Sequence, residues 1–263
     1  MSSRHPALHY SITPLLLFVF IFGCACSLRA SEAKIWEEFS GEKALAHVQR
    51  LVDFGPRPPG SEAIEKSRQY IEDQLRRSGW QVTRQAFTDD TPRGKIHFVN
   101  LIAQFPGRGN TAPVFLLCSH YDTKTFETIR FVGANDGGSS TGLLLELARV
   151  IGGHPSLAAK IELVFFDGEE AYDHFSETDG LYGSRYFAKH LGDSGRFHGG
   201  VLFDMVGDRS LDVTLPADSP PEMARHIFAA AEALKLRNYF TYFDREMIDD
   251  HSPLNAIGIS TID

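Results

Sequence analysis

The feature that most constrains the fold of this chain is a series of short apolar runs that alternate with segments of helical periodicity. The run Ile161–Phe166 is typical of a central strand that is covered on both faces. Further strands are expected at Trp80–Phe87, His97–Phe105, Val114–Ser119, Gly200–Val206 and Ile257–Ile262. Helices are expected over Glu37–Val52, Ser61–Arg77, Gly138–Ile151, Leu181–Leu191 and Pro221–Leu234.

Strands that alternate with helices predict an α/β fold, in which a central sheet is sandwiched by helices. The strands expected between residues 80 and 119 follow one another without a helix, which favours an antiparallel portion and therefore a mixed sheet. Residues 31–263 are long enough for one large domain. Ser61 is expected to cap the second helix, and Ser139, Ser140 or Thr141 the third.

The composition excludes some classes of partner. The formal net charge is −8, and no basic run is present, so nucleic acid is not expected as the main partner. Hydrophobic residues make up 43% and charged residues 23% of the chain, which is typical of a globular protein.

Residues 1–30 have the pattern of a secretory signal peptide. Arg4 precedes the short apolar run Leu15–Phe22, and small residues follow it up to Ala30. The alternatives are an uncleaved membrane anchor and, because of the pair Gly23-Cys24, lipidation. We therefore expect an exported protein that is periplasmic, secreted or membrane-anchored, with this segment as its only contact with a membrane.

The chemically reactive side chains are grouped where the apolar runs end. His120-Tyr121-Asp122 and Asp167-Gly168-Glu169-Glu170 each follow such a run, Asp204 follows a third, and Asn135-Asp136 precedes a helix. In an open α/β sheet, ligands bind beyond the carboxyl ends of the strands. We therefore expect these groups to meet in one crevice.

Carboxylates brought so close together repel one another, and a divalent cation relieves that repulsion. Carboxylates with an imidazole and no thiolate suit a catalytic Zn²⁺. The pair Glu169-Glu170 allows a division of labour, in which one carboxylate binds the metal and the other moves protons. The alternative for this pair alone is a solvated acidic loop.

The sequence resembles the glutaminyl-peptide cyclotransferases, which are close relatives of the zinc aminopeptidases of clan MH. The resemblance spans residues 35–263 and is carried, in family order, by His120-Tyr121-Asp122-Thr123-Lys124, Ala134-Asn135-Asp136, Phe165-Phe166-Asp167-Gly168-Glu169-Glu170-Ala171, Leu181-Tyr182-Gly183-Ser184-Arg185, Leu202-Phe203-Asp204-Met205-Val206-Gly207-Asp208 and Asp249-Asp250-His251-Ser252-Pro253-Leu254. The segment between Glu170 and Leu181 looks like the cyclase version of this region. The resemblance implies a zinc-exopeptidase type of fold.

The resemblance also implies roles for individual residues. Asp136 and Glu170 would be zinc ligands, and Glu169 would be the general acid and base. Asp204 and Asp249 would hydrogen-bond the substrate amine and the proton-transfer network.

Three further implications concern the pocket and the metal count. Phe175 would line the substrate pocket. His120 and Asp204 match positions that bind a second zinc in the aminopeptidases, so one zinc is expected and two are possible. The family's third ligand is a His beyond the last strand, and this chain ends at Asp263. We therefore expect a domain that is truncated at its C-terminus and binds zinc weakly, with His120 as a possible substitute ligand.

The function that the resemblance implies is zinc-dependent conversion of an N-terminal Gln to pyroglutamate with release of ammonia. The partners would be peptides or proteins with an N-terminal Gln. The alternative is a zinc metalloaminopeptidase that hydrolyses N-terminal residues. A second alternative is an inactive exported binding protein or a truncated fragment.

Overall fold

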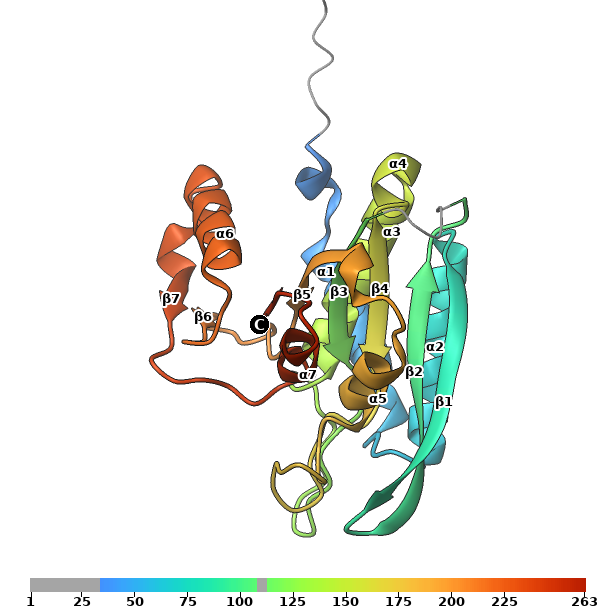
Figure 1. The fold of residues 1–263 in the computed structure, drawn as a ribbon. Helices are drawn as coiled ribbons and strands as arrows, with labels where there is room; N and C mark the ends of the chain where they lie inside the picture. Colours follow the sequence, from blue (N-terminus) through green and yellow to red (C-terminus); the bar gives the residue numbers. More distant parts are fainter. Residues whose placement is uncertain (1–33, 108–112) are drawn as a thin grey trace, which may run out of the picture. The chain divides into compact units, whose positions relative to one another are not determined.

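The computed structural model describes residues 34–107 and 113–263, and its central element is a six-stranded mixed sheet (Figure 1). In spatial order the strands are β1 (Gln81–Thr91), β2 (Gly94–Gln104), β4 (Ile161–Phe166), β3 (Val114–His120), β5 (Phe197–Leu202) and β8 (Thr261–Ile262). The β1–β2 and β2–β4 pairs are antiparallel, and β4, β3, β5 and β8 run parallel. The expected mixed α/β sheet is confirmed.

Helices cover both faces of this sheet, because neighbouring residues of its strands point to opposite sides. On one face, Phe165 of β4 packs with residues of α2 (Glu62–Arg77) and α3 (Gly138–Gly152), and α1 (Gly41–Phe54) lies against α3. On the other face, Phe166 packs with Phe187 of α5 (Tyr182–His190) and Leu254 of α7 (His251–Ala256). The expected leader over residues 1–30 lies outside the described residues.

The remaining elements are short, apart from one helix. They are α4 (Pro155–Ala158), α6 (Pro221–Ala233), β6 (Val213–Leu215), β7 (Phe240–Tyr242) and the 3₁₀ turns Ile35–Glu38, Ser194–Arg196 and Arg237–Tyr239. The parallel pair β6–β7 and helix α6 lie beside the β8 edge of the sheet (Figure 1). Leu215 and Ala224 pack there with Ile262. Among the described helices, none has the length and apolar character needed to span a membrane.

Several boundaries differ from those expected, and those of two strands illustrate this. The strand expected at Gly200–Val206 is β5, which begins earlier and ends at Leu202. The strand expected at Ile257–Ile262 is reduced to β8, because Ile257 closes helix α7 instead. Ile262 is fully buried in this short strand.

The cap expected for the third helix is also wrong. Gly137, and not Ser139, Ser140 or Thr141, is the N-cap of α3, and it makes no side-chain cap. Its φ is +70°, and a Cβ there would lie 2.9 Å from Cε1 of His120. A residue other than glycine would therefore be strained and would collide with His120. Ser61 caps α2 as expected, since its side chain accepts the Ile64 N–H.

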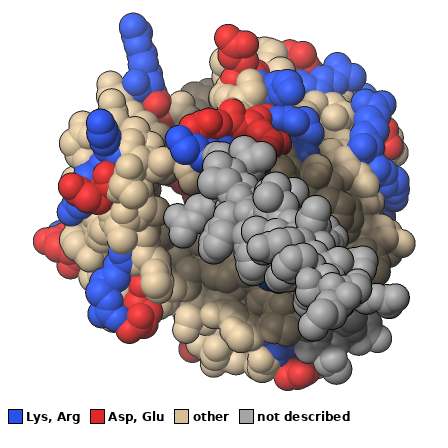
Figure 2. All heavy atoms as spheres, turned by 90° about the horizontal axis from the view of Figure 1, so that it is seen from above, with Lys and Arg blue, Asp and Glu red and all other residues tan. Residues whose placement is uncertain are grey.

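Charged side chains on the surface are mixed in sign. On the face seen in Figure 2, Lys and Arg lie next to Asp and Glu rather than gathering into one positive area. Exposed pairs such as Lys66–Glu62, 2.6 Å apart, contribute little to stability. Several charged side chains are instead buried, and among them His120, Asp122 and Glu169 lie at or just beyond the carboxyl ends of β3 and β4.

Candidate active site

The carboxyl ends of β3 and β5 bring one histidine and two aspartates together. His120 is the last residue of β3, Asp204 follows β5, and Asp136 precedes α3. Nε2 of His120 lies 3.2 Å from Oδ1 of Asp136 and 3.2 Å from Oδ1 of Asp204. Ligand atoms of the three residues all lie within 4.8 Å of one another. We call these three residues the His120 centre.

Asp122 connects this centre to the glutamate pair, a role that we did not assign from the sequence. Its Oδ1 lies 3.3 Å from Nδ1 of His120. The same carboxylate accepts the backbone N–H groups of Glu169 at 3.1 Å and Glu170 at 3.3 Å. Asp122 is fully buried. The signal for this role is its spacing, two residues after His120 at the end of a strand.

The two glutamates occupy different environments. Glu170 hydrogen-bonds Asp136, and its Oε1 accepts the Lys124 N–H at 2.8 Å. Burial, followed by the charges of Asp136 and Asp122, raises the pKa of Glu170 to about 8. Glu169 is only 6% exposed, and burial raises its pKa well above the usual range. The surroundings of Glu169 therefore favour its protonated form more than water does.

The centre is strongly coupled through its charges. Burial by itself lowers the pKa of His120, but the carboxylates of Asp204, Asp122 and Asp136 outweigh it and raise that pKa well above its usual value. For Asp136 the balance is reversed: burial raises its pKa, and hydrogen bonds and charges, led by His120, lower it overall. The pair is therefore an imidazolium beside a carboxylate when no other cation is bound.

Asp167 does not join this group, although it begins the acidic run after β4. Its Oδ2 lies 2.6 Å from NH2 of Arg68 and accepts the Val99 N–H at 2.7 Å. Successive side chains of a strand point to opposite faces of the sheet. Asp167 follows Phe166 and therefore points to the same face as Phe165, which packs against α2. Asp167 therefore serves the packing of α2 on the sheet.

The turn before α7 adds a second acidic position. Asp249 is 6% exposed, and its Oδ1 accepts the Asp250 N–H at 2.5 Å. Burial, with the charges of Asp263 and Asp204, raises the pKa of Asp249 well above its usual value. His251, which follows, does not join the His120 centre and instead lies 2.9 Å from Oδ2 of Asp218.

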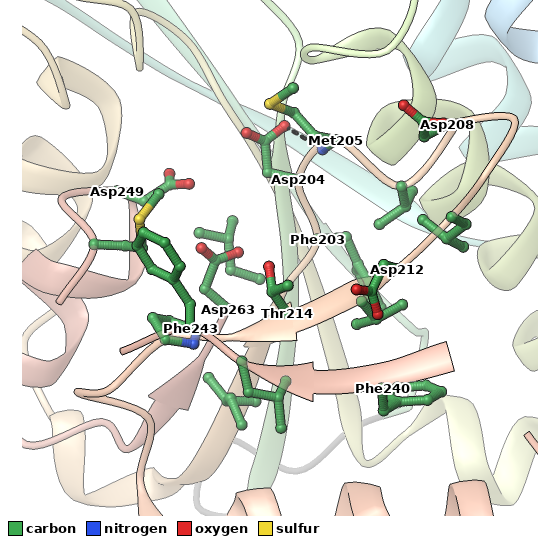
Figure 3. A pocket seen from close by; sticks show the side chains of 18 of the residues that line it. Phe203, Asp204, Met205, Asp208, Asp212, Thr214, Phe240, Phe243, Asp249 and Asp263 are labelled. Carbon is green, nitrogen blue, oxygen red and sulfur yellow. Dashed lines mark hydrogen bonds between the residues drawn. The ribbon is translucent and has the colours of Figure 1, made fainter. Parts of the chain in front are cut away.

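A cavity of about 690 Å³ opens beside the centre (Figure 3). One part of its wall is acidic and includes Asp204 and Asp249. The other part is apolar and includes Phe240 and Phe243. Asn135 also lines it, whereas His120, Asp136 and the glutamate pair do not. The cavity therefore reaches the centre from the side of Asp204.

Phe175 lies on the loop between Glu170 and Leu181 and is 37% exposed. Its ring packs on Gly180, where a Cβ would come within 2.6 Å of it. Asp179 holds the loop, because its carboxylate accepts the N–H groups of Tyr172 at 2.7 Å and Asp173 at 2.8 Å. The loop thus presents an aromatic ring from a fixed backbone.

The residues present fit a zinc ion by the chemistry of their donors. Catalytic zinc is bound by three nitrogen or oxygen side chains with one position left open. The His120 centre supplies one imidazole and two carboxylates at the required proximity. The predicted ligand Asp136 belongs to this set, and the other predicted ligand, Glu170, hydrogen-bonds Asp136. The assignment of Asp136 and Glu170 as zinc ligands stays a prediction.

Comparisons with known proteins identify the family of the chain. The model of peptidase family M28 matches residues 100–263. A glutaminyl-peptide cyclotransferase of Drosophila melanogaster is 34% identical over 180 residues, which are 65% of this chain and 50% of that protein. The chain spans about half the length of the curated relatives it matches.

Solved structures extend the likeness. An Acidobacteriales bacterium glutaminyl cyclase has a TM-score of 0.76 and 32% identity, covering 85% of this chain and 78% of that one. A Zn-dependent exopeptidase from Parabacteroides distasonis has a TM-score of 0.76 and 27% identity, covering 86% and 83%. The chain therefore belongs to peptidase family M28, and within that family its kinship is with the glutaminyl cyclases.

Proposed function

We propose that the chain converts an N-terminal glutaminyl residue of a peptide or protein to pyroglutamate and releases ammonia. The observation that carries this proposal is the buried carboxyl of Glu169, placed beside the His120 centre by the backbone bonds of Asp122. The kinship with proteins named glutaminyl cyclase supports it.

The reaction needs one proton to move between two nitrogens. The α-amine forms a bond to the side-chain amide carbon, the bond from that carbon to the amide nitrogen breaks, and a proton passes from the first nitrogen to the second. Glu169 takes this proton and delivers it to the leaving ammonia. Because burial raises its pKa, the carboxyl holds the proton between the two transfers.

Asp204 and Asp249 orient the substrate amine in this proposal. Both carboxylates line the cavity, and Asp204 also belongs to the centre, so an amine that enters the cavity reaches the centre beside these two side chains (Figure 3). Phe175 is the aromatic side chain that would lie along the substrate, on the loop fixed by Asp179. The α-amine must be neutral to attack, and its N–H groups then donate to these two carboxylates in charge-assisted hydrogen bonds.

His120, Asp136 and Asp204 are the residues that would hold a zinc ion, with Glu170 supporting Asp136. When bound, zinc supplies Lewis-acid polarisation of the side-chain carbonyl. His120 must then lose its proton, because an imidazole binds a metal in its neutral form.

A metalloaminopeptidase is the second candidate. The closeness of His120 and Asp204 to Asp136 favours it, because His120 and Asp204 match positions that bind a second zinc in the aminopeptidases. The relative described as a Zn-dependent exopeptidase supports it as well. In this reaction Glu169 would take a proton from water rather than from the amine.

The two candidates release different products. We would incubate the chain and zinc with Gln-Ala, and separately with Leu-amide, and measure ammonia, pyroglutamyl-Ala and free Leu. Ammonia and pyroglutamyl-Ala from Gln-Ala, without release of Leu, are the expected result. Release of Leu without cyclisation would assign the chain to the aminopeptidases, and a chain that binds Gln-Ala but forms no product would be a binding protein.

A further inference from the structure

Arg57 is a fully buried arginine in the connector between α1 and α2. It takes part in no ion pair within 4.0 Å among the described residues of this chain. Its guanidinium donates instead to backbone carbonyls, to Tyr121 O at 3.1 Å, to Val132 O at 2.7 Å and to Gly133 O at 3.0 Å. A fourth contact, to Leu51 O, is longer at 3.4 Å.

These carbonyls belong to the two ends of one segment. Tyr121 lies between His120 and Asp122, and Gly133 lies three residues before Asp136. The guanidinium therefore joins the start of the segment to its end. The backbone N–H of Arg57 also donates to Oγ1 of Thr123 at 2.9 Å, which fixes the start a second time.

The turn before Asp136 packs directly on this side chain. Gly133 has a φ of +53°, and a Cβ there would lie 3.2 Å from NH2 of Arg57 and 2.6 Å from the backbone oxygen of Asp136. The backbone can approach the guanidinium so closely only because residue 133 has no side chain. The position of Asp136 is therefore tied to the position of Arg57.

Arg57 also places a positive charge behind the acidic site. Burial lowers its pKa to about 10, and the charges of Asp122 and Asp136 act against that decrease. The side chain thus remains a cation at neutral pH. Its charge in turn helps to keep the pKa of Asp136 low. A buried cation is tolerated where hydrogen bonds and opposite charges compensate its desolvation.

We propose that Arg57 is a positioning residue for the His120 centre. It holds residues 121–136 so that Asp122 and Asp136 both face His120, and it offsets the negative charge of these two carboxylates. The proposal rests on the proposed function only in that the centre binds a divalent cation, and it is the same for cyclisation and for peptide hydrolysis.

The test compares variants of the full chain by titration with Co²⁺ alone, whose absorption spectrum reports the ligand geometry. Arg57→Gln removes the charge and most donors, and Arg57→Lys keeps the charge but loses the planar fork. The matched control is Arg196→Gln, which removes a pair with buried Glu162 at the opposite end of β4. Denaturant unfolding of each variant measures its stability.

We expect Arg57→Gln to weaken Co²⁺ binding about 10–100-fold, as loss of residues that orient ligands commonly does. Arg57→Lys should weaken it less and change the Co²⁺ spectrum, and Arg196→Gln should change neither. If Arg57→Gln does not fold, Arg57→Lys decides the question. Native affinity and spectrum in Arg57→Lys, or an equal loss in Arg196→Gln, would overturn the proposal, as would a native chain that binds no Co²⁺. A native chain that binds Co²⁺ but releases no ammonia from Gln-Ala would overturn only the proposed function.

Discussion

Replacing Glu169 by Gln separates proton transfer from the rest of the site. The two side chains have nearly the same shape, and the backbone bond from residue 169 to Asp122 is kept. Burial raises the pKa of Glu169 well above its usual value, so the folded protein holds the charged form of this carboxyl only at a cost, and a neutral amide avoids that cost. We therefore expect the free energy of unfolding to change by about 1 kcal/mol or less.

Turnover should respond very differently. General acid and base catalysis contributes about 10²–10⁴-fold, so Glu169→Gln should raise the activation barrier by about 2.7–5.5 kcal/mol. Metal content should stay near the native value, since residue 169 is outside the His120 centre.

The assay measures ammonia release from Gln-Ala at saturating substrate, together with metal analysis of the same samples. Glu177→Gln is the matched control, because it removes an exposed carboxylate from the loop that carries Phe175. A Glu169→Gln protein that keeps more than about a tenth of native turnover would refute the assignment, since that loss is smaller than proton transfer accounts for.

Three further results are expected. Glu170→Gln should lower metal occupancy, measured by elemental analysis after dialysis, because it removes the carboxylate that hydrogen-bonds Asp136; unchanged occupancy would contradict its role. Burial acts to raise the pKa of Asp218, but its hydrogen bond to His251 and other contacts lower that pKa overall. The ionised carboxylate therefore stabilises the folded chain above about pH 4, and this stabilisation is lost as the pH falls through the lower pKa of the folded state. In urea unfolding, Asp218→Asn should therefore cost about 1 kcal/mol or less at pH 6 and progressively less below pH 4, and a constant difference would be the contrary result. We also propose export: N-terminal sequencing of protein from a cell envelope fraction should find cleavage between Gly23 and Ala30, and a cytoplasmic product that retains Met1 would disagree.

The central strand of the sheet could be predicted from the sequence because it is buried on both faces. Ile161–Phe166 has the expected bounds, since an apolar run between turns leaves little freedom of register. The small strands Val213–Leu215 and Phe240–Tyr242 were not predicted. A strand of three residues is too short to show an alternating pattern of apolar and polar side chains. Which strand it pairs with depends on how the chain between the two strands folds. Ile257–Ile262 alternates as a strand does, yet its first residue ends a helix, because tertiary packing overrides local pattern.

The residues of the candidate site could be predicted from the sequence, but which of them lie next to one another was harder to predict. Each of His120, Glu169 and Asp204 follows a strand, and the carboxyl ends of parallel strands meet at one edge of the sheet. Which carboxylate faces which partner depends on adjacency in the sheet, and the order β4-β3-β5 is not written in the sequence. This order places Asp204 against His120, while alternation turns Asp167 away toward Arg68.

The positive charge that compensates these carboxylates could not be located from the sequence. Candidate ligands such as His120 and Asp204 lie at or just beyond the ends of strands, so a prediction of the strands also predicts where in the fold these residues lie. Arg57 comes from a connector 63 residues before His120, and its contacts are backbone carbonyls, which any sequence provides. Its signal is instead energetic: a guanidinium is buried without a carboxylate in contact only where nearby negative charge compensates its desolvation. Here that charge belongs to Asp122 and Asp136. These two aspartates make the burial of Arg57 tolerable, and Arg57 in turn offsets their negative charge beside His120.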